Sequence, residues 1–338
     1  MIADRYHYSR LSAEEKEIYN LLYKGVSSHE KEVWIPGYFL TQEKTKRIFA
    51  AITDDNPHVY YLDQTHMKFS ASVLGSVFIP EYFFTEEQVR NYNSRVQERV
   101  NQIISSMSLN QCSELEKVKR IHDYIALNIK YDHDALSTTE ARRQIAAHSI
   151  IGVFIQNQAV CEGIAKAVKI LLNTANVKCI VVSGIASLNQ RGPHAWNIVK
   201  IDGKSYHLDV TWDASNTKNK MINYDYFNLP DEAILADHFD FKNVPICDSW
   251  EANYFRINKL CFGNIRVLER AILKGLQRGV HCFYFKMEKE NHTMADIALA
   301  MRNFVLAELT KREEYAKVFS SFNEEQRTAR IVIEYLLA

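Results

Sequence analysis

The stretch that decides the fold runs from Val160 to Asp213. Its two informative segments are VCEGIAKAVKILLNTANVKCIVVSG at 160–184 and HAWNIVKIDGKSYHLDVTWD at 194–213. The first has apolar residues at helical spacing directly after the irregular stretch 155–158, so we expect a helix that begins near Cys161. The second places an Asp-Gly pair between two strand-like runs, which predicts a two-residue β-hairpin.

The predicted start of this helix makes Cys161 a candidate nucleophile. Free N–H groups and the positive end of the helix dipole favour a thiolate, which is the reactive form of cysteine. The helical period also puts Cys161 on the inward face with Ile164 and Val168, and Gly163 would allow another segment to approach closely. The alternative is a structural cysteine, since cysteine is among the residues most often buried.

The hairpin register supplies partners for the thiol. If Ile201 pairs with Lys204, then His194 lies opposite Thr211, and Asp209 is its diagonal neighbour on the same face. Diagonal residues have Cβ atoms about 7–8 Å apart, within reach of an imidazole–carboxylate hydrogen bond. A slip of one residue would move the carboxylate to the other face. We therefore expect Asp209 to orient His194, as the acid of a catalytic triad orients its base.

His207 is the competing histidine in this hairpin. It shares the strand face of Asp209 and lies opposite Ile198. It is closer to the turn than His194, and a histidine satisfied within a sheet is the commoner case. We therefore rank His207 below His194 as the base.

At these residues the chain resembles the core of the transglutaminase-like superfamily, in particular bacterial members described as transglutaminase-like cysteine proteases. The flanking segments EKVKRIHDYIALNIKYD at 116–132 and YDYFNLPDEAILADHF at 224–239 extend the resemblance to roughly 113–240. It implies an α+β, papain-like core in which the helix carrying the nucleophile packs on an antiparallel sheet. It further implies that Cys161 is the nucleophile, His194 the general base and Asp209 the orienting acid.

The resemblance leaves the reaction open. A thioacyl-enzyme is resolved by water in peptide or protein hydrolysis, and by a lysine-like amine in protein-glutamine transamidation. We favour hydrolysis, because no acceptor-amine site and no calcium-type activation site is readable. Two other readings remain, a deglycosylating amidase with the same triad and a non-catalytic module that binds peptides or proteins.

The donors that would stabilise an oxyanion are less evident. The backbone N–H of Cys161 is a natural donor, and Gln156 or Asn157 could supply a second. A polar loop leading into a helix accounts equally well for both side chains.

Aromatic residues provide candidates for a substrate groove. They are Trp196 on the face of His194, Trp212 at the hairpin end, and Tyr224 further downstream. Packing in the core is the commoner role for such residues. The Asp237-His238 pair also follows the triad, and we expect it to close over the site.

Composition bounds the remaining possibilities. Lys plus Arg and Asp plus Glu both number 41, so the net charge is zero and no nucleic-acid partner is expected. Six cysteines without framework spacing indicate reduced thiols. With no apolar leader and no apolar run near the ~20 residues of a membrane span, we expect a cytoplasmic protein. No cofactor or metal motif is present, and the oligomeric state is not indicated.

The order of the predicted elements suggests three parts. Residues 1–108 form an α+β N-terminal region, 109–254 the catalytic core, and 255–338 a small α/β C-terminal domain. We expect a helix opened by Ser12 and closed by Gly25, and a second from Ser113 to about Tyr131. The last part should contain helices at 265–276 and 294–309 and strands at 280–286 and 328–335.

Overall fold

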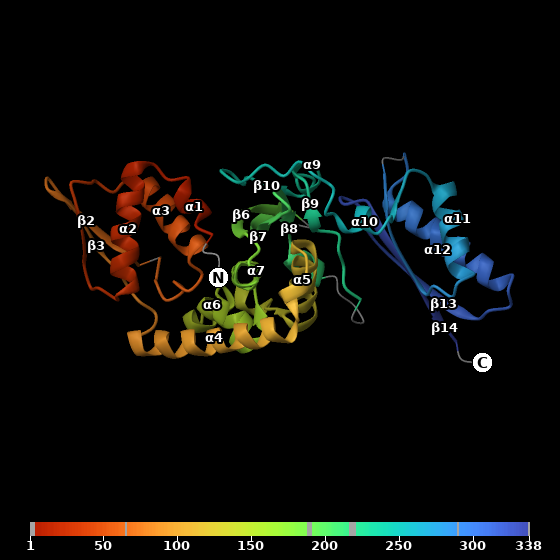
Figure 1. Ribbon diagram of the computed structural model, residues 1–338, viewed down its shortest axis with the longest axis horizontal. Helices are drawn as coiled ribbons and strands as arrows, with labels where there is room; N and C mark the ends of the chain where they lie inside the picture. Colours follow the sequence, from red (N-terminus) through yellow and green to blue (C-terminus); the bar gives the residue numbers. More distant parts are fainter. Residues whose placement is uncertain (1–3, 65, 188–190, 216–220, 289–290, 337–338) are drawn as a thin grey trace.

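The computed structural model describes residues 4–64, 66–187, 191–215, 221–288 and 291–336. The molecule is elongated, with its N-terminal, central and C-terminal parts following one another along the long axis (Figure 1). Helices and largely antiparallel sheets alternate along the chain, which confirms the predicted α+β class. In the described ranges, no helix is both long enough and apolar enough to cross a membrane.

The N-terminal part packs helices against a small sheet of strand order β1-β3-β2. Its elements are α1 (Tyr6–Ser9), α2 (Ala13–Ser27), β1 (Val33–Pro36), α3 (Gln42–Asp55), β2 (Lys68–Ser72) and β3 (Gly75–Ile79). The next helix, α4 (Glu86–Ser106), runs along the central part (Figure 1). Ser12 forms the predicted capping box, but α2 does not end at Gly25. A Cβ on Gly25 would overlap the side chain of Val33. This glycine therefore lets β1 approach the helix and does not terminate it.

The central part carries a five-stranded antiparallel sheet of order β10-β6-β7-β8-β9. Its helices are α5 (Glu114–Asn128), α6 (Ala141–Ala147), α7 (Cys161–Thr174), α8 (Val210–Ser215) and α9 (Asp231–Ile234), with short helical turns at Leu109–Gln111, Asp134–Leu136 and Gly152–Gln156. Its strands are β4 (Lys130–Tyr131), β5 (Gln158–Ala159), β6 (Cys179–Ser187), β7 (Arg191–Ile201), β8 (Lys204–Leu208), β9 (Phe227–Leu229) and β10 (His238–Phe239). Ala165 of α7 packs on Val181 and Ala195 of the sheet, as predicted for the helix that starts at Cys161.

The hairpin register is confirmed over the length of β8. Ile201 pairs with Lys204, and the pairing continues to Asn197 opposite Leu208. The predicted pairing of His194 with Thr211 is wrong, because β8 ends at Leu208 and Thr211 lies in α8.

Asp209 is the residue at which the chain leaves β8 and enters α8. Its Oδ1 accepts hydrogen bonds from the backbone N–H groups of Thr211 (2.9 Å) and Trp212 (3.2 Å), the pattern of a helix N-cap. These bonds hold the carboxylate at the end of the strand beside β7.

Helix α5 ends earlier than its sequence suggested. Ser113 forms the expected capping box, but the helix stops at Asn128 and not near Tyr131. Lys130 and Tyr131 leave the helix to form β4, which pairs in parallel with β5 just before α7. This short pairing carries Tyr131 to the start of the nucleophile helix.

The C-terminal part is a four-stranded sheet of order β11-β12-β14-β13 covered by two helices (Figure 1). Its elements are α10 (Tyr254–Ile257), β11 (Cys261–Phe262), α11 (Ile265–Leu276), β12 (Cys282–Met287), α12 (Met294–Thr310), β13 (Ala316–Asn323) and β14 (Thr328–Tyr335). The predicted helices and strands are present within one or two residues. The additional strand β13 is an edge strand with mostly exposed side chains, so its sequence lacks the apolar alternation that would have revealed it.

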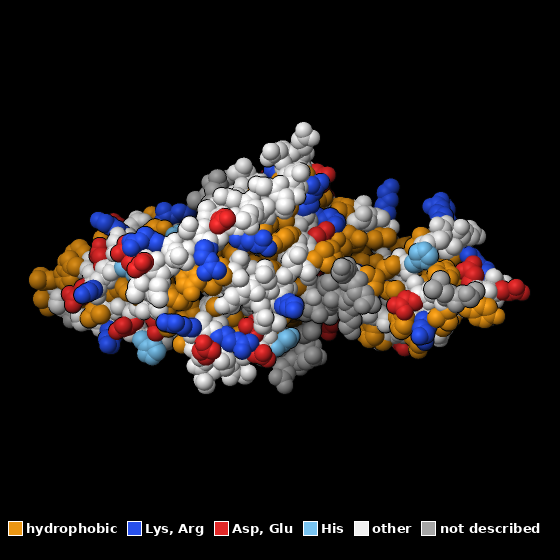
Figure 2. All heavy atoms as spheres, turned by 90° about the horizontal axis from the view of Figure 1, so that it is seen from below, with side chains coloured by type: hydrophobic (Ala, Val, Ile, Leu, Met, Phe, Trp, Pro, Cys, Tyr) orange, Lys and Arg blue, Asp and Glu red, His pale blue; other side chains and the backbone are white. Residues whose placement is uncertain are grey.

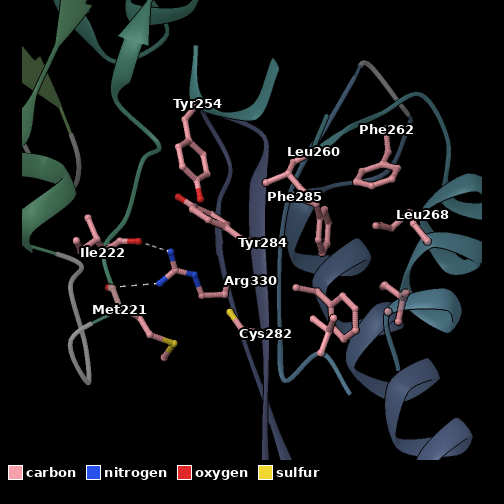
Figure 3. Close-up of a pocket in the computed structure, with 15 residues that line it drawn as sticks. Met221, Ile222, Tyr254, Leu260, Phe262, Leu268, Cys282, Tyr284, Phe285 and Arg330 are labelled. Atoms are coloured by element: carbon pink, nitrogen blue, oxygen red, sulfur yellow. Dashed lines mark hydrogen bonds between the residues drawn. The ribbon is translucent and has the colours of Figure 1, made fainter. Parts of the chain in front are cut away.

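A cavity of about 490 Å³ lies beside β12 and α11, next to the boundary with the central part (Figure 3). At this boundary Arg330 donates hydrogen bonds to the carbonyl oxygens of Met221 (3.4 Å) and Ile222 (2.6 Å). The space-filling view shows hydrophobic side chains on this face of the molecule near the same boundary (Figure 2). The C-terminal sheet therefore contacts residues 221 and 222, which precede β9.

Gly163 is the residue at which α7 comes closest to its neighbours, as its sequence position suggested. A Cβ there would overlap the carbonyl oxygen of Ala147 and lie 2.9 Å from that of Ser149. We expect Gly163→Ala to lower the free energy of unfolding by about 1–3 kcal/mol, because backbone must shift to admit the methyl group. Gly263→Ala is the control, since the nearest atom to its Cβ is the end of the Glu288 side chain at 3.8 Å. Equal stability of both variants in urea would contradict the prediction.

Candidate active site

Cys161 is the first residue of α7 and is half-buried. The N-cap position is held by Val160 in an extended conformation, and valine has no side-chain oxygen to cap the first turn. The N-cap side chain therefore accepts no hydrogen bond from the backbone N–H groups of this turn. Such a helix start favours a thiolate or a developing oxyanion.

The acidic neighbour of Cys161 is neutralised. Glu162 forms ion pairs with Lys166 and with His148, whose Nδ1 lies 3.0 Å from the carboxylate. Burial raises the pKa of Glu162, but Lys166 and His148 outweigh it and lower that pKa to about 2. The carboxylate is thus ionised and paired, which limits its repulsion of a thiolate at Cys161.

His194 and Asp209 are in direct contact, as the register predicted. Nε2 of His194 lies 2.7 Å from Oδ2 of Asp209, and both residues are buried. Because Nε2 faces the carboxylate, Nδ1 is the ring nitrogen left for another partner. The thiol of Cys161 is near enough to the imidazole of His194 to raise its pKa. The structure therefore brings Cys161, His194 and Asp209 together in the order expected of a triad.

The electrostatics of the pair favour charge on both groups. Burial lowers the pKa of His194, but the Asp209 charge, its hydrogen bond and the Cys161 thiol raise it to about 10. Burial likewise raises the pKa of Asp209, while His194 and His238 bring it well below its usual range. His194 is therefore an imidazolium paired with the Asp209 carboxylate at neutral pH.

His238 occupies a different place from the one expected. It was predicted to close over the site, but it is fully buried, with Nε2 at 3.2 Å from Oδ2 of Asp209. Its Nδ1 lies 2.6 Å from Oδ1 of Asp237. The Asp237-His238 pair therefore contacts Asp209 from β10, which is the edge strand of the sheet and lies next to β6.

The aromatic groove candidates separate into two kinds. Trp196 is fully buried and stacks on the His194 ring at 5.9 Å, so it packs behind the imidazole and does not line an open groove. Tyr224 is also buried, stacked on Tyr254 at 3.8 Å. Only Trp212 of the three is half-exposed, with its ring 5.3 Å from that of His194. Trp212 therefore remains a candidate for the substrate groove.

The oxyanion candidates Gln156 and Asn157 are both exposed, at the end of the helical turn that precedes β5. The sequence did not point to Tyr131, whose hydroxyl lies beside Cys161. Burial raises the pKa of Tyr131 to about 12, with a further contribution from Cys161. Its hydroxyl is therefore a neutral donor beside the nucleophile. The two-residue strand that brings it there has no sequence pattern long enough to detect.

His207 belongs to a different contact. Its Nδ1 accepts a hydrogen bond from Nε1 of Trp196 (3.0 Å), and its Nε2 lies 2.8 Å from Asp231. These bonds hold the indole on which His194 stacks. His207 thus contacts Trp196 and not Cys161 or Asp209, which agrees with ranking it below His194 as the candidate base.

Among the residues that the structure describes, two groups of side chains have the composition of a metal site. One is His194, Asp209 and His238, and the other is His207 with Asp231 and Cys247; ligand atoms within each lie within 4.8 Å of one another. In the first group the ring nitrogens facing Asp209 are already hydrogen-bonded to it. We therefore interpret it as a hydrogen-bonded network.

A helix whose N-terminus presents a cysteine to a histidine on an adjoining antiparallel sheet defines a papain-like core. Residues 101–210 match the family model of the transglutaminase-like superfamily, so this part of the chain is a transglutaminase-like domain. The resemblance expected from the sequence is thereby confirmed for these residues.

Curated relatives match a similar length of the chain. It is 27% identical over 164 residues to the kyphoscoliosis peptidase of Mus musculus, covering 44% of this chain and 24% of the relative. The Homo sapiens kyphoscoliosis peptidase is 26% identical over 175 residues, covering 46% and 26%. The chain thus spans about a quarter of the length of these relatives. The crystal structure of a TGase aligns over 56% of this chain and 52% of its own, with 17% identity and a TM-score of 0.33.

Proposed function

We propose that this protein is a thiol-dependent enzyme that transfers the acyl group of an amide, most often to water. The observation that carries the proposal is that Cys161, at the start of α7, lies beside His194, whose Nε2 is 2.7 Å from Oδ2 of Asp209. The relatives named peptidases support hydrolysis of peptide or protein substrates.

In the proposed resting enzyme the thiol proton of Cys161 has already passed to Nδ1 of His194, which gives a thiolate beside an imidazolium. The thiolate attacks the carbonyl carbon, and the oxyanion is stabilised by the backbone N–H of Cys161 and the hydroxyl of Tyr131. Nδ1–H of His194 then protonates the departing amine as the C–N bond breaks. Asp209 keeps the ring oriented and stabilises its charge throughout.

The thioacyl-enzyme is next attacked by water, whose proton passes to Nδ1 of His194. The tetrahedral intermediate collapses, the C–S bond breaks, and a carboxylic acid and the free thiol are released. An amine in place of water would give transamidation by the same steps. The rival function is a non-catalytic binding module, which does not require a charged Cys–His pair. The reactivity of the Cys161 thiol therefore distinguishes an enzyme from a binding module.

The test is the pH dependence of alkylation at Cys161 by iodoacetamide, followed by peptide mass spectrometry. At pH 6 an ordinary thiol of pKa ~8.5 is only about 0.3% ionised, so a thiolate held by His194 should react roughly 10- to 100-fold faster. We expect His194→Ala to remove that advantage.

Cys112 and Cys282 serve as references within the same molecule, since both are accessible to reagent. Labelling of Cys161 at pH 6 no faster than that of these two, or unchanged in His194→Ala, would favour the binding module.

A further inference from the structure

A second histidine holds the carboxylate of the proposed triad. Oδ2 of Asp209 is shared by Nε2 of His194 at 2.7 Å and Nε2 of His238 at 3.2 Å. The other ring nitrogen of His238 meets Oδ1 of Asp237 at 2.6 Å. Ionised carboxylates only accept hydrogen bonds, so a ring that contacts one through each nitrogen carries both protons. His238 is therefore an imidazolium between two buried carboxylates.

Asp237 is held in turn by the C-terminal part of the chain. Its Oδ2 accepts hydrogen bonds from the hydroxyl of Tyr226 (2.7 Å) and from Nε2 of Gln326 (3.3 Å). Asn323, the last residue of β13, donates to the Tyr226 hydroxyl at 3.1 Å. Gln326 is buried in the turn between β13 and β14. A continuous series of hydrogen bonds thus runs from this turn to Asp209.

The same C-terminal sheet also forms hydrogen bonds with the segment that carries Tyr226. Arg330 of β14 binds the carbonyl oxygens of residues 221 and 222 (Figure 3). Asp225 accepts hydrogen bonds from Tyr284 of β12 (2.5 Å) and Thr328 of β14 (2.6 Å). The residue directly before Tyr226 is therefore fixed by two strands of the C-terminal sheet.

We propose that His238 and Asp237 are positioning residues of the active site, and that the C-terminal part sets the orientation of Asp209 through Tyr226 and Gln326. The inference rests on the proposed function of Cys161 and His194. It gives residues 255–338 a role that their sequence did not indicate.

Two consequences follow from the charge on His238. Its N–H group gives Oδ2 of Asp209 a second hydrogen bond beside that of His194 and so helps to fix the plane of the carboxylate. Its positive charge, with ring centres 5.4 Å apart, also opposes protonation of His194. The groups that face His238 are Asp209 and Asp237 in contact, Tyr226 at 5.7 Å between ring centres, and the imidazoles of His194 and His207. Burial lowers the pKa of His238, but the two carboxylates outweigh burial and raise it.

The experiment measures the rate of Cys161 alkylation against pH in the full chain, for wild type, His238→Gln and Tyr226→Phe. We expect His238→Gln to react roughly tenfold more slowly at pH 6, the cost of one charge-assisted hydrogen bond. The basic limb of its profile, where His194 loses its proton, should move to higher pH because a neighbouring cation is gone. Tyr226→Phe removes one hydroxyl and keeps the ring, so we expect a rate about threefold lower with the basic limb unmoved.

Thr293→Ala is the control for a general loss of stability in the C-terminal part. It removes the N-cap of α12 and makes no contact with the series of hydrogen bonds described above. Its profile should superimpose on that of wild type.

The outcomes are distinct. If His238→Gln keeps the wild-type rate and basic limb, the inference is overturned while the proposed function stands. If Tyr226→Phe keeps the wild-type rate while His238→Gln is slower, the role of the C-terminal part is overturned. If His194→Ala leaves Cys161 reactivity unchanged, the proposed function fails and this inference fails with it.

Discussion

Replacing Cys161 with serine is expected to abolish amide turnover, by about 10⁴-fold or more, because the acyl group then has no thiolate to accept it. The measurement is mass spectrometry of a pool of unstructured peptides rich in glutamine and lysine. Cleaved products report hydrolysis at the backbone, deamidated products report hydrolysis at glutamine, and cross-linked products report transamidation. One assay therefore decides both the need for the thiol and the acceptor.

Cys112→Ser is the matched control, since Cys112 is also half-buried and lies at the end of the Leu109–Gln111 turn, just before α5. It should keep wild-type turnover and the wild-type product distribution. Turnover that survives in Cys161→Ser, with the protein folded, would show that the reaction uses another nucleophile.

Replacing Asp209 with alanine is expected to damage stability and catalysis together. The change leaves His194 and His238 buried without their shared carboxylate and removes the cap of α8. Breaking a buried ion pair in this way costs about 3–5 kcal/mol, and loss of the orienting acid slows a triad by about 10³–10⁴-fold. Urea unfolding and Cys161 alkylation measure the two effects separately.

Asp209→Asn separates the two roles of the carboxylate. An amide oxygen can still accept from the N–H groups of Thr211 and Trp212, but the charge shared by the two histidines is gone. We expect Asp209→Asn to recover part of the stability and little of the reactivity. Recovery of wild-type alkylation by this variant would contradict a role for the charge.

The stability difference between wild type and Asp209→Asn should depend on pH in a defined direction. The pKa of Asp209 is lowered on folding, so its contribution is present above the unfolded value of about 4 and is lost as pH falls below it. The pKa of His194 is raised to about 10, so its contribution is full below the unfolded value. For an unfolded value of about 6.5, that contribution fades as pH rises towards 10. The largest difference is expected between about pH 4 and 6.5.

Much of this site was predictable because its geometry is local. The helix that begins at Cys161 follows from apolar spacing within 14 residues. The approach of Asp209 to His194 follows from one Asp-Gly turn, because a two-residue turn fixes the register of both strands that it joins. Gly163 was predicted as a point of close approach for the same reason, since its place on α7 follows from the helical period.

Other features depend on contacts that no local pattern encodes. The end of β8 at Leu208 is determined by the cap that Asp209 provides to α8, so the expected pairing of Thr211 did not form. Tyr131 reaches Cys161 through a parallel pairing of two residues, too short to leave a period in the sequence. His238 contacts Asp209 although the two residues are 29 positions apart in the sequence. The contact depends on the pairing of β10 with β6, two strands away from β8 in the sheet.

Periodicity and turn chemistry thus sufficed to predict the three residues of the proposed triad, since helix phase and hairpin register act over a few residues. The surroundings of the triad could be seen only in the tertiary structure. They are the hydroxyl beside the thiol and the second imidazolium in contact with the carboxylate. Their positions depend on which distant strands pair and which faces are buried together. Those choices are made by the free energy of the whole fold and not by any single segment.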